Sequence, residues 1–142
     1  MKKVAIILNQ PIINDSRMIK IINTLSKVTL IDLFYLNGEA IKDGLLFNNN
    51  VRLFPIKSND TFLTKLIRHS LFYNELNYFV DHVLKTNELY DFIYSCDLPT
   101  LKPGVILKDK LKAQLIYDSH ELYVEGLNQF FPSKNSSGFI KS

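Results

Sequence analysis

Short apolar runs alternate with amphipathic stretches along most of the chain. Residues 4–8 form a continuous β-rich run, the pattern of a strand buried on both faces of a sheet. After a polar turn, apolar residues recur at the helical spacing i, i+3, i+4, i+7 from Met18 to Leu25, and Asp15 or Ser16 is the expected N-cap. Further apolar runs predict four strands, the last of them buried, at 28–35, 51–56, 92–95 and 115–117.

The connections between these strands differ in pattern. Residues 36–50 are rich in Gly and Asn and predict a loop. The longest helix is expected at approximately 62–85, begun by Asp60 or Thr61. Another helix is expected to start at Asp97-Leu98-Pro99, since proline is tolerated in a first turn. Periodicity is lost towards the end, so we expect one domain over 1–128 and a loosely held tail over 129–142.

Alternation of strands and helices predicts an α/β fold, a Rossmann-like parallel sheet of about five strands with helices on both faces. The expected strand order is 3-2-1-4-5, and ligands of such sheets bind beyond the carboxyl ends of the strands where the order reverses. Three polar loops should therefore converge there, at 9–17, 97–100 and 118–121.

Composition and charge narrow the class of protein. The chain has 142 residues, 46% hydrophobic and 22% charged, as in an ordinary globular domain, and its apolar runs are too short to span a membrane. Its single cysteine, Cys96, fits a reducing cytoplasm and provides no metal cluster. The net charge of +3 is mild and lysine greatly outnumbers arginine, so we expect no nucleic-acid partner.

Several candidate motifs have ordinary interpretations. The first loop lacks both the glycine pattern of dinucleotide sites and that of ATP sites, so no cofactor is expected. His69 and His82 are too far apart for a helical zinc pair, and no metal is expected. Lys65 and Arg68 form either a solvated helix face or a basic patch for peripheral membrane contact, at the inner face of the membrane.

The polar residues after the fourth and fifth strands are the stronger functional candidates. Asp97 is either a helix cap or an acceptor for sugar hydroxyls. Asp118 and Ser119 are interpreted mainly as caps, and Ser119 lacks the G-x-S-x-G turn of a hydrolase nucleophile. His120 exceeds what capping requires, and an imidazole at a strand's end can donate, accept or stack.

Three segments carry a resemblance to a known family. They read D-S-R-M-I-K-I-I-N-T-L-S-K-V-T-L from residue 15, Y-D-F-I-Y-S-C-D-L-P-T-L from residue 90 and A-Q-L-I-Y-D-S-H-E-L-Y from residue 113. Together they resemble the N-terminal domain of family 4 glycosyltransferases, which are two-domain, retaining enzymes of the GT-B fold. The likeness covers most of residues 1–125.

The resemblance implies the acceptor-side half of an enzyme that transfers a sugar from a nucleotide-sugar to a glycan or lipid-linked acceptor, in bacterial surface polysaccharide synthesis. It implies catalytic roles for His120 and Glu121. The substrate-binding residues that it implies are Asn9, Gln10, Asp15, Arg17, Asp97, Thr100 and Asp118.

Two departures qualify this resemblance. The first loop has none of the glycines that admit a phosphate in many members, and no glutamate has another eight positions further on, as the donor-binding C-terminal domain would. We therefore expect that the donor domain is absent and that the isolated chain is inactive. The alternatives are a non-catalytic interaction module, or a separate half that needs a partner chain, and a small flavodoxin-like domain whose polar loops are only caps.

Overall fold

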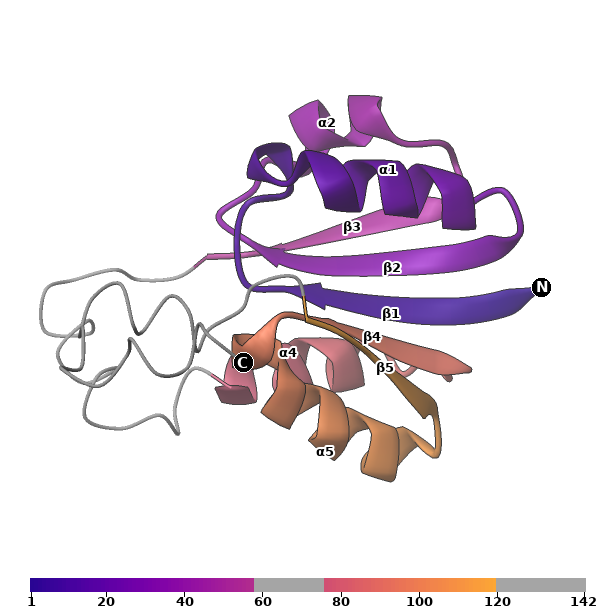
Figure 1. The fold of residues 1–142 in the computed structure, drawn as a ribbon, viewed down its shortest axis with the longest axis vertical. Coiled ribbons are helices and arrows are strands. Elements are labelled where there is room, and N and C mark those ends of the chain that lie inside the picture. Colours follow the sequence, from indigo (N-terminus) through magenta and orange to yellow (C-terminus); the bar gives the residue numbers. More distant parts are fainter. Residues whose placement is uncertain (58–75, 120–142) are drawn as a thin grey trace, which may run out of the picture.

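A computed structural model of the chain describes residues 1–57 and 76–119. They form an α/β, Rossmann-like fold around a five-stranded parallel sheet in the order β3-β2-β1-β4-β5, which confirms the predicted architecture (Figure 1). The strands are β1 (Lys2–Leu8), β2 (Thr29–Leu36), β3 (Val51–Ile56), β4 (Phe92–Cys96) and β5 (Gln114–Asp118).

Helices cover both faces of the sheet. On one face lie α1 (Ser16–Leu25) and the short α2 (Ala40–Asp43), and on the other lie α4 (Leu76–Lys85) and α5 (Leu101–Leu111) (Figure 1). Three 3-10 turns complete the described elements: η1 (Ile12–Asn14), η2 (Gly44–Leu46) and η3 (Leu98–Thr100). In the described part of the chain, no helix is long and apolar enough to cross a membrane.

Each face of the sheet has its own apolar core, because successive strand residues point to opposite faces. Ala5 and Ile7 of β1 pack in the cluster that contains Val83 and Leu107, on the side of α4 and α5. The alternate residues of β1 pack in a second cluster with Met18 and Ile22 of α1. Residues 4–8 are all buried, so the prediction of a strand covered on both faces is confirmed.

The sequence analysis predicted a loop over residues 36–50, and the structure shows that this segment also contains regular elements. It contains the end of β2, the helical turn α2 and the turn η2. The carboxylate of Asp43 anchors this segment, since it is 6% exposed and accepts hydrogen bonds from the Tyr35 hydroxyl at 2.7 Å and the Glu39 amide at 2.9 Å. These bonds explain how a stretch rich in Gly and Asn holds a helical turn.

The prediction that the fifth strand is buried was also wrong. Ile116 is 40% exposed and Tyr117 is 39% exposed, and Gln114 is exposed as well. The reason is position, because β5 lies at the end of the strand order and has a neighbouring strand on one side only, β4. An apolar run typical of a buried strand therefore forms an edge strand in the described structure.

A buried carboxylate joins the strands towards their amino ends. Asp32 of β2 is 1% exposed and accepts two hydrogen bonds from Arg52 of β3, at 2.8 and 2.7 Å, and one from the Tyr90 hydroxyl at 2.6 Å. Burial raises the pKa of Asp32, but the bonds from Arg52 and Tyr90 and the charge of Lys3 outweigh it, and the pKa lies below its ordinary value. Asp32 is thus held as a carboxylate by its partners.

Several predictions fall on residues outside the described ranges. The expected helix at 62–85 is described from Leu76 onward, as α4. Its expected start at Asp60 or Thr61, the basic pair Lys65 and Arg68, His69 and the expected tail 129–142 all lie outside the described residues.

Candidate functional site

The order of the strands brings three loops together at the edge of the sheet that the carboxyl ends of its strands form. β1 lies between β2 and β4, and β4 pairs with β5, so the segments that leave the carboxyl ends of β1, β4 and β5 are neighbours. The backbone links two of them directly, since the Asp97 amide donates to the Asp118 carbonyl at 2.9 Å. This is the point at which the strand order reverses, where ligands of open α/β sheets bind.

The loop after β1 is fixed by Asp15, the N-cap of α1. Its carboxylate is 7% exposed and accepts from the Met18 amide at 3.0 Å, as the sequence predicted. The other carboxylate oxygen accepts from the side-chain amide of Gln10 at 2.9 Å. Asp15 and Gln10 therefore hold each other and shape the loop, while Asn9 is exposed beside them.

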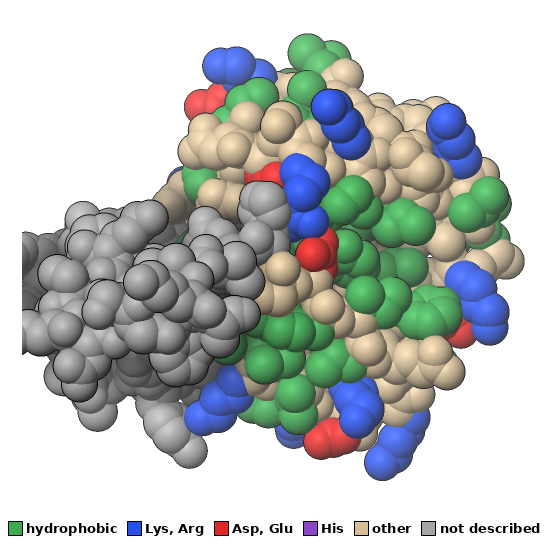
Figure 2. Space-filling view, in the orientation of Figure 1, with side chains coloured by type: hydrophobic (Ala, Val, Ile, Leu, Met, Phe, Trp, Pro, Cys, Tyr) green, Lys and Arg blue, Asp and Glu red, His purple; other side chains and the backbone are tan. Residues whose placement is uncertain are grey.

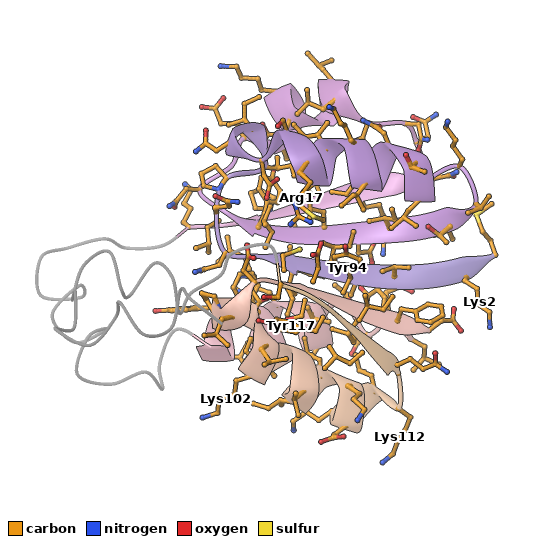
Figure 3. All side chains as sticks on the ribbon, viewed as in Figure 1. Lys2, Arg17, Tyr94, Lys102, Lys112 and Tyr117 are labelled. Carbon is orange, nitrogen blue, oxygen red and sulfur yellow. The ribbon has the colours of Figure 1, made fainter. Side chains whose placement is uncertain are left out.

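Arg17, Asp118 and Tyr94 form the central polar cluster of this edge, and Figure 3 labels Arg17 and Tyr94. One carboxylate oxygen of Asp118 accepts from Arg17 Nη1 at 2.6 Å and from the Tyr94 hydroxyl at 2.7 Å. The side chains of Arg17 and Asp118 are 30% and 20% exposed, so water screens the ion pair only in part. The pair connects the first turn of α1 with the end of β5, across 101 positions of sequence.

The environment of the cluster shifts two pKa values. Burial works to lower the pKa of Arg17, but its hydrogen bond with Asp118 and the charge of that carboxylate raise the pKa above its ordinary value overall. Burial, and then the hydrogen bond to Asp118, raise the pKa of Tyr94 far above its usual range. The cluster therefore consists of a guanidinium, a carboxylate acceptor and a neutral phenol that donates.

Arg17 has more donors than this pair uses. Within the described residues, its Nε and Nη2 atoms are buried and have no hydrogen-bond partner. A guanidinium offers five N–H donors, and unpaired buried donors of a charged group are costly. The pair with Asp118 therefore leaves some of the donors of Arg17 unused.

Asp97 has a backbone conformation that side chains rarely adopt. Its φ is 64° and its ψ is 169°, in a region that is almost restricted to glycine. Asp97 occupies the N-cap position of η3, but its side chain makes no capping hydrogen bond there. The strain costs on the order of 1–3 kcal/mol, and such strain clusters at functional sites.

Thr100 supports this strained turn from inside the protein. Its hydroxyl is fully buried and lies 2.7 Å from the Cys96 carbonyl, 3.1 Å from the Asp97 carbonyl and 2.8 Å from the Ser95 hydroxyl. Helix α5 then starts after η3 at Leu101, not at Asp97. Thr100 therefore holds the backbone of the site and has no exposed surface of its own.

Cys96 is a core residue at the base of the site. It is 1% exposed, and its thiol lies 3.8 Å from the sulfur of Met18. Burial raises the pKa of the Cys96 thiol well above its ordinary value, which disfavours the thiolate that nucleophilic chemistry needs. Within the described ranges, His, Cys, Asp and Glu side chains form no group of three or more that could hold a metal ion.

The structure brings together five of the predicted substrate-binding residues: Gln10, Asp15, Arg17, Asp97 and Asp118. The predicted catalytic residues His120 and Glu121 follow Ser119 and lie outside the described residues.

Sequence analysis missed Tyr94 and assigned Asp118 mainly to capping. Tyr94 pairs in register with Ile116, so it lies on the same face of the sheet as Asp118, two positions along β5. The signal was a tyrosine one position before the end of the predicted strand 92–95, while an acid, Asp118, directly follows the predicted strand 115–117.

Comparison of the chain with protein-family models and with curated proteins gives no match. What the chain does must therefore be argued from its sequence motifs and from the geometry of this edge.

Proposed function

We propose that this chain is the acceptor-side domain of a retaining glycosyltransferase that takes its sugar from a nucleotide-sugar donor. The observation that best supports the proposal is the Arg17–Asp118 ion pair at the reversal point of the sheet. It ties together two of the three segments on which the family resemblance rests, although they are far apart in sequence. The strained Asp97 belongs to the remaining segment, the one that begins at residue 90.

In this proposal the site positions an acceptor and supports charge, and it supplies no nucleophile of its own. The Asp97 carboxylate accepts from sugar hydroxyls, and Arg17 donates to a hydroxyl or anionic oxygen of the substrate. The strained turn and the ion pair hold these groups in fixed positions, and catalysis by orientation requires such rigidity.

His120 and Glu121 have the roles that the resemblance implies. By the resemblance, His120 acts on the transferred sugar or the donor phosphate, and Glu121 binds hydroxyls or supports His120. The developing oxocarbenium-like centre is stabilised electrostatically. In an enzyme that joins this chain to a donor-binding domain, His120→Ala should lower turnover at least about tenfold, which equals about 1.4 kcal/mol of transition-state stabilisation.

The donor is held mainly by a C-terminal domain in this proposal. The chain alone should then bind nucleotide-sugars weakly and transfer no sugar. Calorimetry with UDP-glucose and related nucleotide-sugars measures this directly. Micromolar binding by the chain alone would show that the donor site has been assigned to the wrong domain.

The acceptor role can be tested on the chain alone by amide NMR. The probes are octyl glycosides of glucose, galactose and N-acetylglucosamine, used below the concentration at which they form micelles. We expect shifts confined to residues near 9–17, 94–100 and 117–119. Asp97→Asn should weaken binding roughly tenfold, since a charged acceptor becomes a neutral one.

Asp91→Asn is the matched control, because Asp91 immediately precedes β4 at the opposite edge of the sheet. This variant should leave the affinity unchanged. Shifts that gather near Asp91, or equal losses in both variants, would rule out the proposed acceptor site.

A further inference from the structure

The outward face of α5 carries lysines and an exposed apolar side chain. Lys102, Val105 and Lys108 are exposed at spacings of three residues, and Lys112, the C-cap residue, continues the same side of the helix. Pro103, Gly104 and Leu107 are buried on the opposite side. Lys102 and Lys112 mark the two ends of the helix and lie away from the sheet (Figure 3).

The positive charge of the α5 segment is not balanced by acids within the helix. The segment from Leu101 to Lys112 has four lysines (102, 108, 110 and 112) and one acid, Asp109, so its net charge is 4 − 1 = +3. Lys108 lies 4.0 Å from Asp109, with the two side chains 47% and 71% exposed, so this pair is weak and well solvated. Figure 2 shows basic side chains gathered along the margin of the molecule where α5 lies.

Apolar side chains accompany these lysines. Val105 is 40% exposed in the middle of the face, and Leu98, in the turn before α5, is 50% exposed. Tyr117 of β5 is 39% exposed on the side of the sheet that α5 covers. Exposed apolar groups among lysines are suited to the boundary between lipid headgroups and acyl chains. A solvated helix face or a contact with the phosphate backbone of a nucleic acid requires no such apolar groups.

The sheet fixes the direction of this face. Gly104 lies so close to the sheet that a Cβ there would be 3.0 Å from the Ser95 hydroxyl and 3.1 Å from Leu115. The helix therefore packs closely against β4 and β5, and this contact fixes which side of α5 faces outward.

We propose that the outward face of α5 is a docking surface for an anionic lipid bilayer. Lysines near such a surface each add to the attraction, and the apolar side chains add contact with the acyl boundary. This deepens the proposed function and rests on it for its meaning, because Leu98 adjoins Asp97 and Tyr117 adjoins Asp118. A bilayer along α5 would then present a lipid-linked acceptor at the edge where the candidate site lies.

The test uses the full chain and sedimentation with lipid vesicles. We expect binding to vesicles that contain about one third phosphatidylglycerol and little binding to pure phosphatidylcholine, and a marked loss between roughly 0.1 M and 0.5 M salt. Lys108→Glu with Lys112→Glu should weaken binding at least about tenfold, because two attractive charges become repulsive. Val105→Ser should also weaken binding at low salt, although it changes no charge.

The matched control is Lys20→Glu with Lys27→Glu, two exposed lysines in and just beyond α1, on the other face of the sheet. It makes the same change in net charge and should retain binding. Equal losses of vesicle binding in the two double variants would overturn the proposal, because they would show that the vesicles attract the net charge of the protein and not the α5 face. So would tighter binding to heparin or duplex DNA than to anionic vesicles. Absent vesicle binding together with intact octyl-glycoside shifts would overturn this inference and leave the proposed function standing.

Discussion

Replacing Asp118 by alanine removes the acceptor that holds Arg17 and Tyr94 together. The variant loses two hydrogen bonds to a charged group, each worth about 1.5–3 kcal/mol when broken, so the upper limit is about 6 kcal/mol. Arg17 is 30% exposed, and water can replace part of what it loses. We therefore expect the free energy of unfolding to fall by about 2–3 kcal/mol, or roughly 6–10 °C in Tm.

Urea denaturation followed by far-UV circular dichroism measures this loss. Asp109→Ala is the control, since it removes an acid that is 71% exposed, and it should change stability by less than about 1 kcal/mol. A double-mutant cycle between Arg17→Met and Asp118→Asn isolates the pair itself. The coupling energy should be about 1–2 kcal/mol. A coupling below about 0.3 kcal/mol would show that solvent screens the pair and that it does not hold the site in place.

Three further predictions test other parts of the structure. The pKa of Asp32 is lowered in the folded protein, so the unfolded chain binds the proton first as pH falls. The contribution of Asp32 to stability is complete above the ordinary pKa of 3.8 and is lost as pH falls from there through the pKa of the folded state. Asp32→Asn should therefore flatten the dependence of stability on pH in that range, as measured by acid denaturation. A Cβ on Gly38 would overlap the ring of the buried Tyr35, so Gly38→Ala should cost more than about 2 kcal/mol, whereas Gly44→Ala, whose nearest contact would be 4.0 Å away, should be neutral or stabilising by urea denaturation. Asp97→Gly should relieve backbone strain and leave stability unchanged or raise it by up to about 2 kcal/mol while octyl-glycoside binding is lost, and a clear loss of stability would contradict the strain argument.

The sequence by itself determined the features that depend on neighbours a few residues apart. The spacing of apolar residues gives the strands and helices, and their alternation indicates a doubly wound α/β fold, whose usual strand order 3-2-1-4-5 is the one observed. The Asp15 cap belongs to the same class, because its bond to the Met18 amide spans three residues. Such contacts follow from local geometry, and a single sequence is enough to predict them.

Tertiary structure decided what depends on residues far apart. Whether an apolar strand is buried depends on what covers it, so Ile116 is exposed on an edge strand despite its apolar surroundings in sequence. Asp118 pairs with Arg17, 101 positions away, and only the register of β1, β4 and β5 brings the two together. The left-handed backbone of Asp97 is likewise held by a distant residue, because its amide donates to the carbonyl of Asp118 at the end of β5.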